Sequence, residues 1–182
     1  MRDERLELTL FAADPDIVTP IGIAVDSRDR VYVLESHTHL PPSDYPGPTG
    51  DRIKLFTDRD RDGTADAVQI FADGIDDGMN LAFSPAGELY VVAAREVWAL
   101  HDRDGDGVSE SRTRVLEMAR PEQVYDHAGL LGITFSPDGN FLAAVAPRRY
   151  FCTACHVQQT EARPLVDNTY RDMLLLEPEN GE

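Results

Sequence analysis

The chain has 182 residues, of which 42% are hydrophobic and 27% charged, a mixture typical of a folded globular protein rather than of a disordered chain. This length allows one domain with a substantial core, or one domain with a short appendage, and excludes two full domains. Lys and Arg total 17 against 33 Asp and Glu, so the formal net charge is −16. We therefore expect no nucleic-acid partner, because binding phosphate needs clustered basic side chains. An acidic surface suits cations and basic protein partners, or serves solubility alone.

The apolar residues are spread along the chain in short groups. No run approaches the ~18 apolar residues that span a bilayer, so we expect no transmembrane segment. Residues 1–7 (MRDERLE) also lack the apolar region of a secretory signal. If the protein works outside the cytoplasm, either a leader has been removed or the start of the gene is missing.

A strand, turn and strand phrase occurs three times along the chain, at residues 21–35, 79–93 and 131–145. Its apolar residues alternate with period two, and SPAG (84–87) and SPDG (136–139) supply turn chemistry. Each of the first two phrases is followed by two more predicted strands, Arg52–Phe56 with Ala67–Phe71, and Glu96–Leu100 with Thr113–Leu116. Four short antiparallel strands per unit are typical of a β-propeller blade.

The sequence therefore predicts an all-β fold, a partial β-propeller of about two and a half four-stranded blades, followed by a short irregular or helical segment. The expected divisions are a first blade with a preceding strand (1–75), a second blade (76–121), half of a third blade (122–145) and a C-terminal segment with a tail (146–182). Closure usually takes at least ~4 blades. We therefore expect open sheet edges that could pair with another chain.

The first unit carries an insertion rich in Pro and His, residues 37–50 (HTHLPPSDYPGPTG). Loops of this kind lie at propeller rims, where sites are often built. His37 and His39 in this insertion, together with His127, are candidate general bases. A general base also needs a partner and a positioned substrate. Surface histidines without a catalytic role are the alternative.

Both complete units contain an acidic loop between their third and fourth strands, at residues 58–66 (DRDRDGTAD) and 102–110 (DRDGDGVSE). Calcium takes six to eight oxygen ligands, and carboxylates at positions 1, 3 and 5 converge when a Gly at position 6 allows a sharp turn. The bidentate Glu at position 12 of an EF-hand is absent, and an acidic solvated turn is the alternative. We predict up to two structural calcium ions, with ligands Asp58, Asp60, Asp62, Thr64 and Asp66, and Asp102, Asp104, Asp106, Val108 and Glu110.

The two cysteines of the chain are spaced C-x-x-C and are followed directly by His, as Cys152, Cys155 and His156. This pattern is typical of covalent c-type haem attachment, in which the thiols add to the haem vinyl groups and the histidine binds the iron. A zinc site and a thioredoxin-type thiol pair are the alternatives. We expect one covalent haem with His156 as proximal ligand. The sequence does not decide which residue is the distal ligand; the candidates are His37, His39, His101, His127, Met79, Met118 and Met173.

Two parts of the chain resemble known families. Residues from about 17 to 142 resemble the β-propeller of planctomycete and verrucomicrobial membrane-bound dehydrogenases, which are similar to glucose/sorbosone dehydrogenases. The matching stretches are VYVLESHTH, DRIKLFTD, DDGMNLAFSPAGELYVV, REVWALHDRDGDG and HAGLLGITFSPDG. Residues from about 146 to 170 (APRRYFCTACHVQQTEARPLVDNTY) resemble the C-terminal haem region of the small cytochrome c electron-transfer subunit of periplasmic nitrate reductase. That family has two C-x-x-C-H motifs, and this chain has one. The two resemblances join near residues 140–147, inside a predicted strand, as a gene fusion or rearrangement would leave them.

Three functions remain open at this point. The first is a periplasmic or otherwise extracytoplasmic c-type cytochrome, with one haem on a calcium-stabilised propeller-like scaffold and a reductase or dehydrogenase subunit as redox partner. The second is a propeller dehydrogenase that oxidises a sugar or alcohol with a quinone-type cofactor and passes electrons to the haem. The third is a calcium-binding propeller fragment without catalysis, from a truncated or fused gene. The haem motif favours an electron-transfer component over a complete enzyme.

Overall fold

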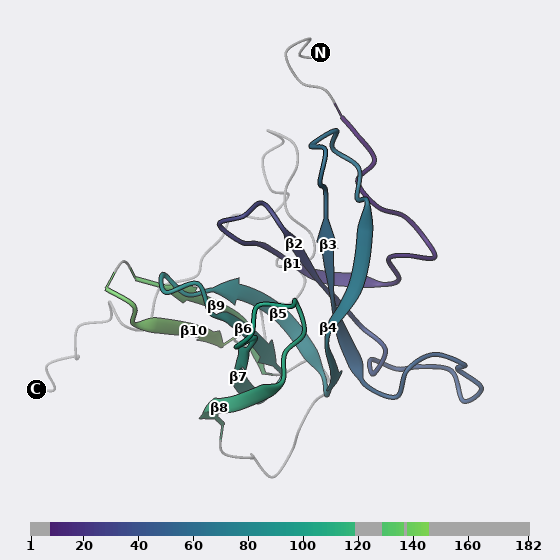
Figure 1. Ribbon diagram of the computed structural model, residues 1–182. Helices are drawn as coiled ribbons and strands as arrows, with labels where there is room; N and C mark the ends of the chain where they lie inside the picture. Colours follow the sequence, from purple (N-terminus) through teal and green to yellow (C-terminus); the bar gives the residue numbers. More distant parts are fainter. Residues whose placement is uncertain (1–7, 119–128, 137, 146–182) are drawn as a thin grey trace, which may run out of the picture.

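The computed structural model describes residues 8–118, 129–136 and 138–145 (Figure 1). All regular structure in this part of the chain is β, as the sequence predicts. The ten strands are β1 (Pro20–Val25), β2 (Val31–Glu35), β3 (Asp51–Thr57), β4 (Ala67–Ile75), β5 (Gly78–Phe83), β6 (Leu89–Ala93), β7 (Glu96–His101), β8 (Ser111–Glu117), β9 (Leu130–Phe135) and β10 (Phe141–Val145). They include every strand predicted within the blades, with β4 and β8 longer than expected, but not the strand predicted before the first blade.

The strands form two four-stranded antiparallel sheets, in the order β1-β2-β3-β4 and β5-β6-β7-β8, and one hairpin of β9 and β10. The turns between β1 and β2, between β5 and β6, and between β9 and β10 are closed by equivalent hydrogen bonds. The amide of Asp26 donates to the carbonyl of Arg30 at 3.0 Å, and Ser84 and Ser136 make the corresponding bonds to Glu88 and Asn140 at 2.9 Å. The repeated phrase of the sequence is thus a repeated hairpin.

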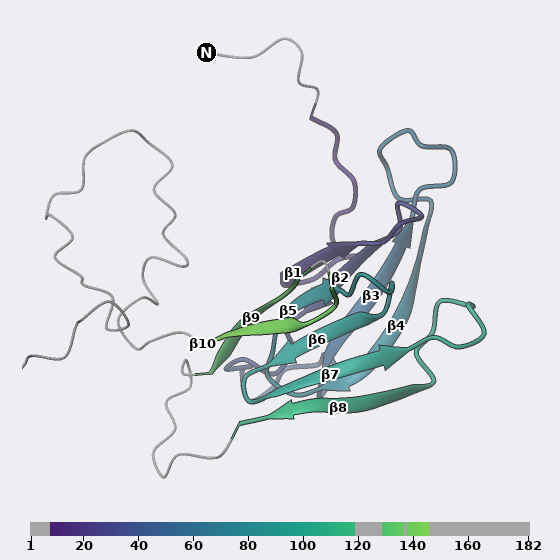
Figure 2. The same ribbon diagram turned by 90° about the vertical axis from the view of Figure 1, so that its left-hand side faces the viewer.

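The two sheets pack face to face through one apolar core (Figure 2). The buried residues of this core are Tyr32, Leu34, Ile53, Leu55, Phe71 and Ile75 from the first sheet and Leu81, Leu89, Val91 and Leu100 from the second. A smaller cluster joins the other face of the second sheet to β9, through Val92, Val97 and Leu130. Each fully buried side chain of this size contributes about 1.5–3 kcal/mol relative to exposure.

The other face of the first sheet is open along its edge strands, β1 and β4, while Val33 and Phe56 in its middle are buried. The strand register places Ile23 in one row with Ile70, and Val25 in one row with Val68, on the face that points away from the second sheet. These four side chains are 66%, 43%, 54% and 40% exposed. The equivalent rows of the second sheet, through Leu81 and Leu89, are buried in the core.

The segment before β1 covers one end of this open face. The sequence predicts a strand before the first blade, but residues 8–19 form no regular strand. The carbonyl of Phe11 nevertheless accepts a hydrogen bond from the amide of Ala65 at 2.9 Å. Its ring lies 6.3 Å from that of Phe56, between centroids. The segment therefore packs on the sheet without extending it.

Candidate functional site

The two acidic loops lie at the same end of their sheets and have the same pattern of internal hydrogen bonds. In the first, Asp58 accepts the amides of Arg61 (2.7 Å) and Gly63 (2.9 Å), and Asp66 accepts that of Arg59 (2.6 Å). The second repeats this position by position: Asp102 accepts the amides of Gly105 (2.8 Å) and Gly107 (3.1 Å), and Glu110 accepts that of Arg103 (3.0 Å). The repeated sequence pattern therefore specifies a repeated loop conformation.

These loops bring most of the predicted calcium ligands together. Carboxylate oxygens of Asp58, Asp60 and Asp66 lie within 4.8 Å of one another, and so do those of Asp102, Asp104, Asp106 and Glu110. Asp62 does not join the first group, and its carboxylate accepts the amide of Thr64 at 2.8 Å. The amide hydrogen bonds define the conformation of both loops. The convergent carboxylates offer oxygen ligands of the kind that calcium takes.

The rim insertion lies at the opposite end of the first sheet, after β2 (Figure 1). Asp51, which has no exposed surface, anchors the insertion through hydrogen bonds. Its carboxylate accepts the amides of His37 (2.5 Å), Thr38 (2.8 Å) and Gly78 (2.7 Å) and the hydroxyl of Thr38 (3.0 Å). One carboxylate thus joins the insertion to the first residue of β5. Asp51 was not predicted from the sequence, although a charged residue that opens an apolar strand is a signal for such a role.

A chain of three polar side chains, of which two are buried and the third, Tyr45, is half-buried, lies beside Asp51. Glu35, at the end of β2, is 1% exposed, and one of its oxygens accepts the amide of Val18 (2.7 Å) and pairs with Lys54 (2.9 Å). Its other oxygen lies 3.5 Å from Nε2 of His37, and Nδ1 of His37 lies 2.5 Å from the hydroxyl of Tyr45. His37 is therefore a buried side chain with two polar neighbours, rather than a surface residue.

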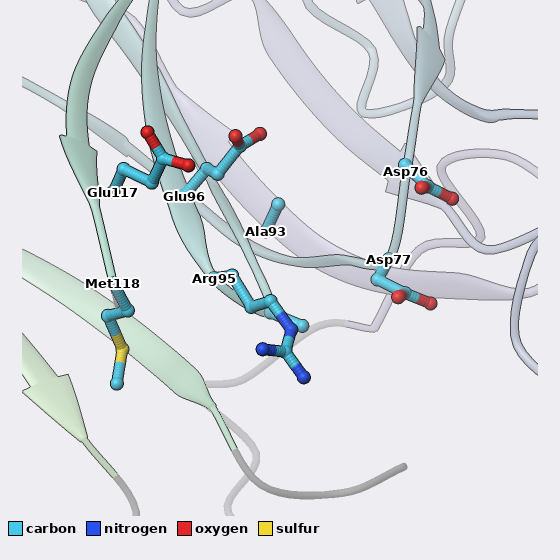
Figure 3. A pocket seen from close by; sticks show the side chains of 8 residues that line it. Asp76, Asp77, Ala93, Arg95, Glu96, Glu117 and Met118 are labelled. Atoms are coloured by element: carbon cyan, nitrogen blue, oxygen red, sulfur yellow. The ribbon is translucent and has the colours of Figure 1, made fainter. Parts of the chain in front are cut away.

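A cavity of about 630 Å³ lies at the same end of the sheets, between the loop after β4 and the turn after β6. Figure 3 shows its carboxylates as two pairs, Asp76 with Asp77 and Glu96 with Glu117. Burial raises the pKa of Asp77 above its ordinary value, and the carboxylates of Asp76 and Asp51 raise it further.

The remaining predicted site residues are more scattered. His39 is exposed near the rim. His101 lies at the acidic-loop end, where Nε2 is 2.9 Å from the hydroxyl of Thr113. Met79 and Met118 pack against the smaller apolar cluster. The predicted haem residues Cys152, Cys155 and His156, and also His127 and Met173, lie outside the described residues.

A family model described as Domain of unknown function (DUF7133) matches residues 2–171, a span that includes the predicted join at 140–147. Among curated proteins, the periplasmic nitrate reductase electron transfer subunit of Cereibacter sphaeroides is 47% identical over 85 residues, which cover 45% of this chain and 55% of that protein. The same subunit of Neorhizobium galegae is 43% identical over 76 residues, covering 40% and 47%. The chain thus spans about half the length of the curated relatives it matches. Alignments of this length extend beyond the 146–170 segment in which the sequence analysis placed the resemblance.

Two solved structures are also similar. The first is the PQQ domain of pyranose dehydrogenase from Coprinopsis cinerea, with a TM-score of 0.42 and 15% identity, covering 58% of this chain and 23% of that chain. The second is virginiamycin B lyase from Staphylococcus aureus, with a TM-score of 0.45 and 17% identity, covering 74% of this chain and 36% of that chain. At these scores neither likeness bears on function. Within the described residues, no helix is long and apolar enough to cross a bilayer.

Proposed function

The chain belongs to the family described as Domain of unknown function (DUF7133), and on that premise we propose that it is an extracytoplasmic electron-transfer protein with one covalent c-type haem. Cys152 and Cys155 tether the haem, and His156 is the proximal iron ligand. The partner is a redox protein of the nitrate-reductase type. The propeller-like sheets act as the scaffold of the haem segment.

The observation that carries this proposal is the motif from Cys152 to His156, in a chain that is 47% identical over 85 residues to an electron transfer subunit. Two thiols and an adjacent imidazole are the donor set for covalent haem attachment. The haem supplies one-electron transfer when bound. Formation of such a site requires an extracytoplasmic compartment, which is the compartment named for the relatives.

The surface charge suits a docking partner. A formal net charge of −16 attracts a basic protein surface and increases the rate of encounter at low salt. We expect transfer to the partner to slow as ionic strength rises, because salt screens exposed charges over ~8 Å at physiological concentration.

The test is production of the full chain with a periplasmic leader and the haem-maturation machinery. A Soret band and an intact mass raised by one haem are expected, and a Cys152→Ala, Cys155→Ala double variant should lose both. An unmodified mass without a Soret band would overturn the proposal and leave a calcium-binding protein without redox chemistry as the better account.

We also propose that each acidic loop binds one structural calcium ion, through Asp58, Asp60, Asp62, Asp66 and the carbonyl of Thr64, and through Asp102, Asp104, Asp106, Glu110 and the carbonyl of Val108. An ion would neutralise the clustered carboxylates and stabilise the long loop. The convergence of Asp102, Asp104, Asp106 and Glu110 supports this proposal, and so does that of Asp58, Asp60 and Asp66; Asp62 would have to turn toward the ion.

Calcium binding is tested by thermal unfolding. Calcium at 100 times its Kd should add about 2.7 kcal/mol per site to the free energy of unfolding, and a chelator should remove that gain. Asp102→Asn with Asp104→Asn should abolish one site, and Asp58→Asn with Asp60→Asn the other. Asp138→Asn, in the hairpin turn after β9, is the matched control and should keep both. An unchanged melting temperature on calcium addition would contradict the proposal.

The dehydrogenase remains the second candidate, supported by the contact between the buried His37 and the half-buried Tyr45, which both line a cavity. Its test is reduction of an artificial electron acceptor with sugars or alcohols, in the presence of a quinone cofactor. Loss of that activity in Tyr45→Phe would favour it over electron transfer alone.

A further inference from the structure

A cavity of about 570 Å³ lies at the rim end, where β1 and β5 begin and the insertion folds over them. Its walls are mainly apolar and include Ile21, Leu40, Pro41 and Met79. Leu40 is 70% exposed and Ile21 is 42% exposed. The size and the lining are those of a site for a small molecule.

Two of the polar side chains that line this cavity meet each other. His37 and Tyr45 both line it, and their side chains are joined at 2.5 Å. Nε2 of His37 is buried without a hydrogen bond, 3.5 Å from the carboxylate of Glu35. If the proton of the imidazole lies on Nε2, toward Glu35, then Nδ1 accepts the proton of the Tyr45 hydroxyl. The phenol oxygen is then left to accept a hydrogen bond from a molecule in the cavity.

Backbone strain is concentrated around the same cavity. Five non-glycine residues in the described part of the chain have a positive φ, and three of them line this cavity: Thr19 (46°), Leu40 (48°) and Asp77 (49°). This conformation is unfavourable for an L residue, and most of all for a β-branched one such as Thr19. Strain of this kind persists where the surrounding structure imposes it, and it gathers at ligand sites.

Asp77, the acidic residue in the cavity wall, is compatible with an uncharged ligand. Burial raises the pKa of Asp77, and the neighbouring carboxylates raise it further. A carboxyl group with a raised pKa tolerates an uncharged ligand better than a fully ionised one does.

We propose that this cavity binds an uncharged, largely apolar alcohol, whose hydroxyl donates a hydrogen bond to the phenol oxygen of Tyr45. His37 and Glu35 are positioning residues that orient the phenol. The apolar walls contact the rest of the ligand. This site is independent of the haem and calcium proposals; it contains the His37–Tyr45 pair of the dehydrogenase candidate, but binding of the alcohol is tested without any oxidation of it.

The test is NMR titration of the full-length, isotope-labelled protein with benzyl alcohol, and with toluene as the probe that lacks the hydroxyl. Benzyl alcohol should produce saturable shifts of the Leu40 and Met79 methyl signals and of the His37 ring signals. It should bind roughly fivefold more tightly than toluene, which is the scale of one hydrogen bond between neutral groups.

Tyr45→Phe should bind both probes with equal affinity, while its amide spectrum stays that of the folded protein. Tyr90→Phe is the matched control, because its hydroxyl lies outside the cavity, 3.5 Å from Glu88, and it should keep the preference. The proposal is wrong if no cavity signal shifts saturably, if the unaltered protein binds toluene as well as benzyl alcohol, or if Tyr45→Phe keeps the preference for the alcohol.

Discussion

Asp51 is the polar residue whose removal should matter most for stability, because it accepts four hydrogen bonds and has no exposed surface. Asp51→Ala leaves buried amides without acceptors, and we expect it to lower the free energy of unfolding by about 3 kcal/mol. Asp73→Asn, in an exposed pair with Arg52, should lower it by less than about 1 kcal/mol. Urea unfolding of both variants checks this, and equal midpoints would contradict it.

Asp26 should make stability depend on pH. Burial by itself raises the pKa of its carboxyl, but hydrogen bonds from the amide and side chain of Arg30 outweigh that effect, so the pKa is lowered. The stabilisation is therefore complete above the ordinary carboxyl pKa of about 3.9 and is lost as the pH falls through the lower pKa of the folded state. Asp26→Asn should be less stable than the parent at pH 7, and the difference should vanish in strong acid. A pH-independent difference between the two unfolding curves would argue against this origin.

At the scale of single elements, the two acidic loops differ at their fourth position. Arg61 has a φ of 61°, where the second loop has Gly105 at 78°. Arg61→Gly should stabilise the protein by about 0.5 kcal/mol, since relief of the left-handed conformation is partly offset by glycine entropy in the unfolded chain. Gly105→Arg should have the opposite effect. Differential scanning calorimetry of the two variants measures both, and a destabilised Arg61→Gly would show that the Arg61 side chain contributes more than its exposed contact with Asp29 indicates.

The strands and their turns were predictable from local pattern alone. Period-two alternation predicted the strands, and the SPAG and SPDG turns have Gly87 and Gly139 at φ values of 85° and 89°. The first hairpin reaches the same turn with Asp29 at 63°, which the sequence did not indicate. Acidic spacing likewise predicted the convergence of Asp58 with Asp60 and of Asp102 with Asp104, because those groups lie within one short loop.

At the scale of the whole molecule, the open face of the first sheet should favour self-association. Ile23 and Ile70 lie on its two edge strands with exposures of 66% and 43%, and burial of these apolar side chains against a second copy would favour association. We expect the sedimentation coefficient to rise with protein concentration. Ile23→Lys with Ile70→Lys should abolish that rise and leave the unfolding midpoint nearly unchanged. A parent protein that stays monomeric, or a double variant that associates equally, would contradict this expectation.

The sequence by itself determined the all-β class, the repeated hairpins and the acidic loops, because each depends on residues close together in the chain. Only the tertiary structure placed the rim insertion over the start of β5, where Asp51 binds Gly78 and where Glu35, His37 and Tyr45 meet. These contacts depend on how one sheet packs on the next and how a long loop returns to it. No local pattern records such distances, so His37 appeared in the sequence as one histidine among five and is found in the structure between a carboxylate and a phenol.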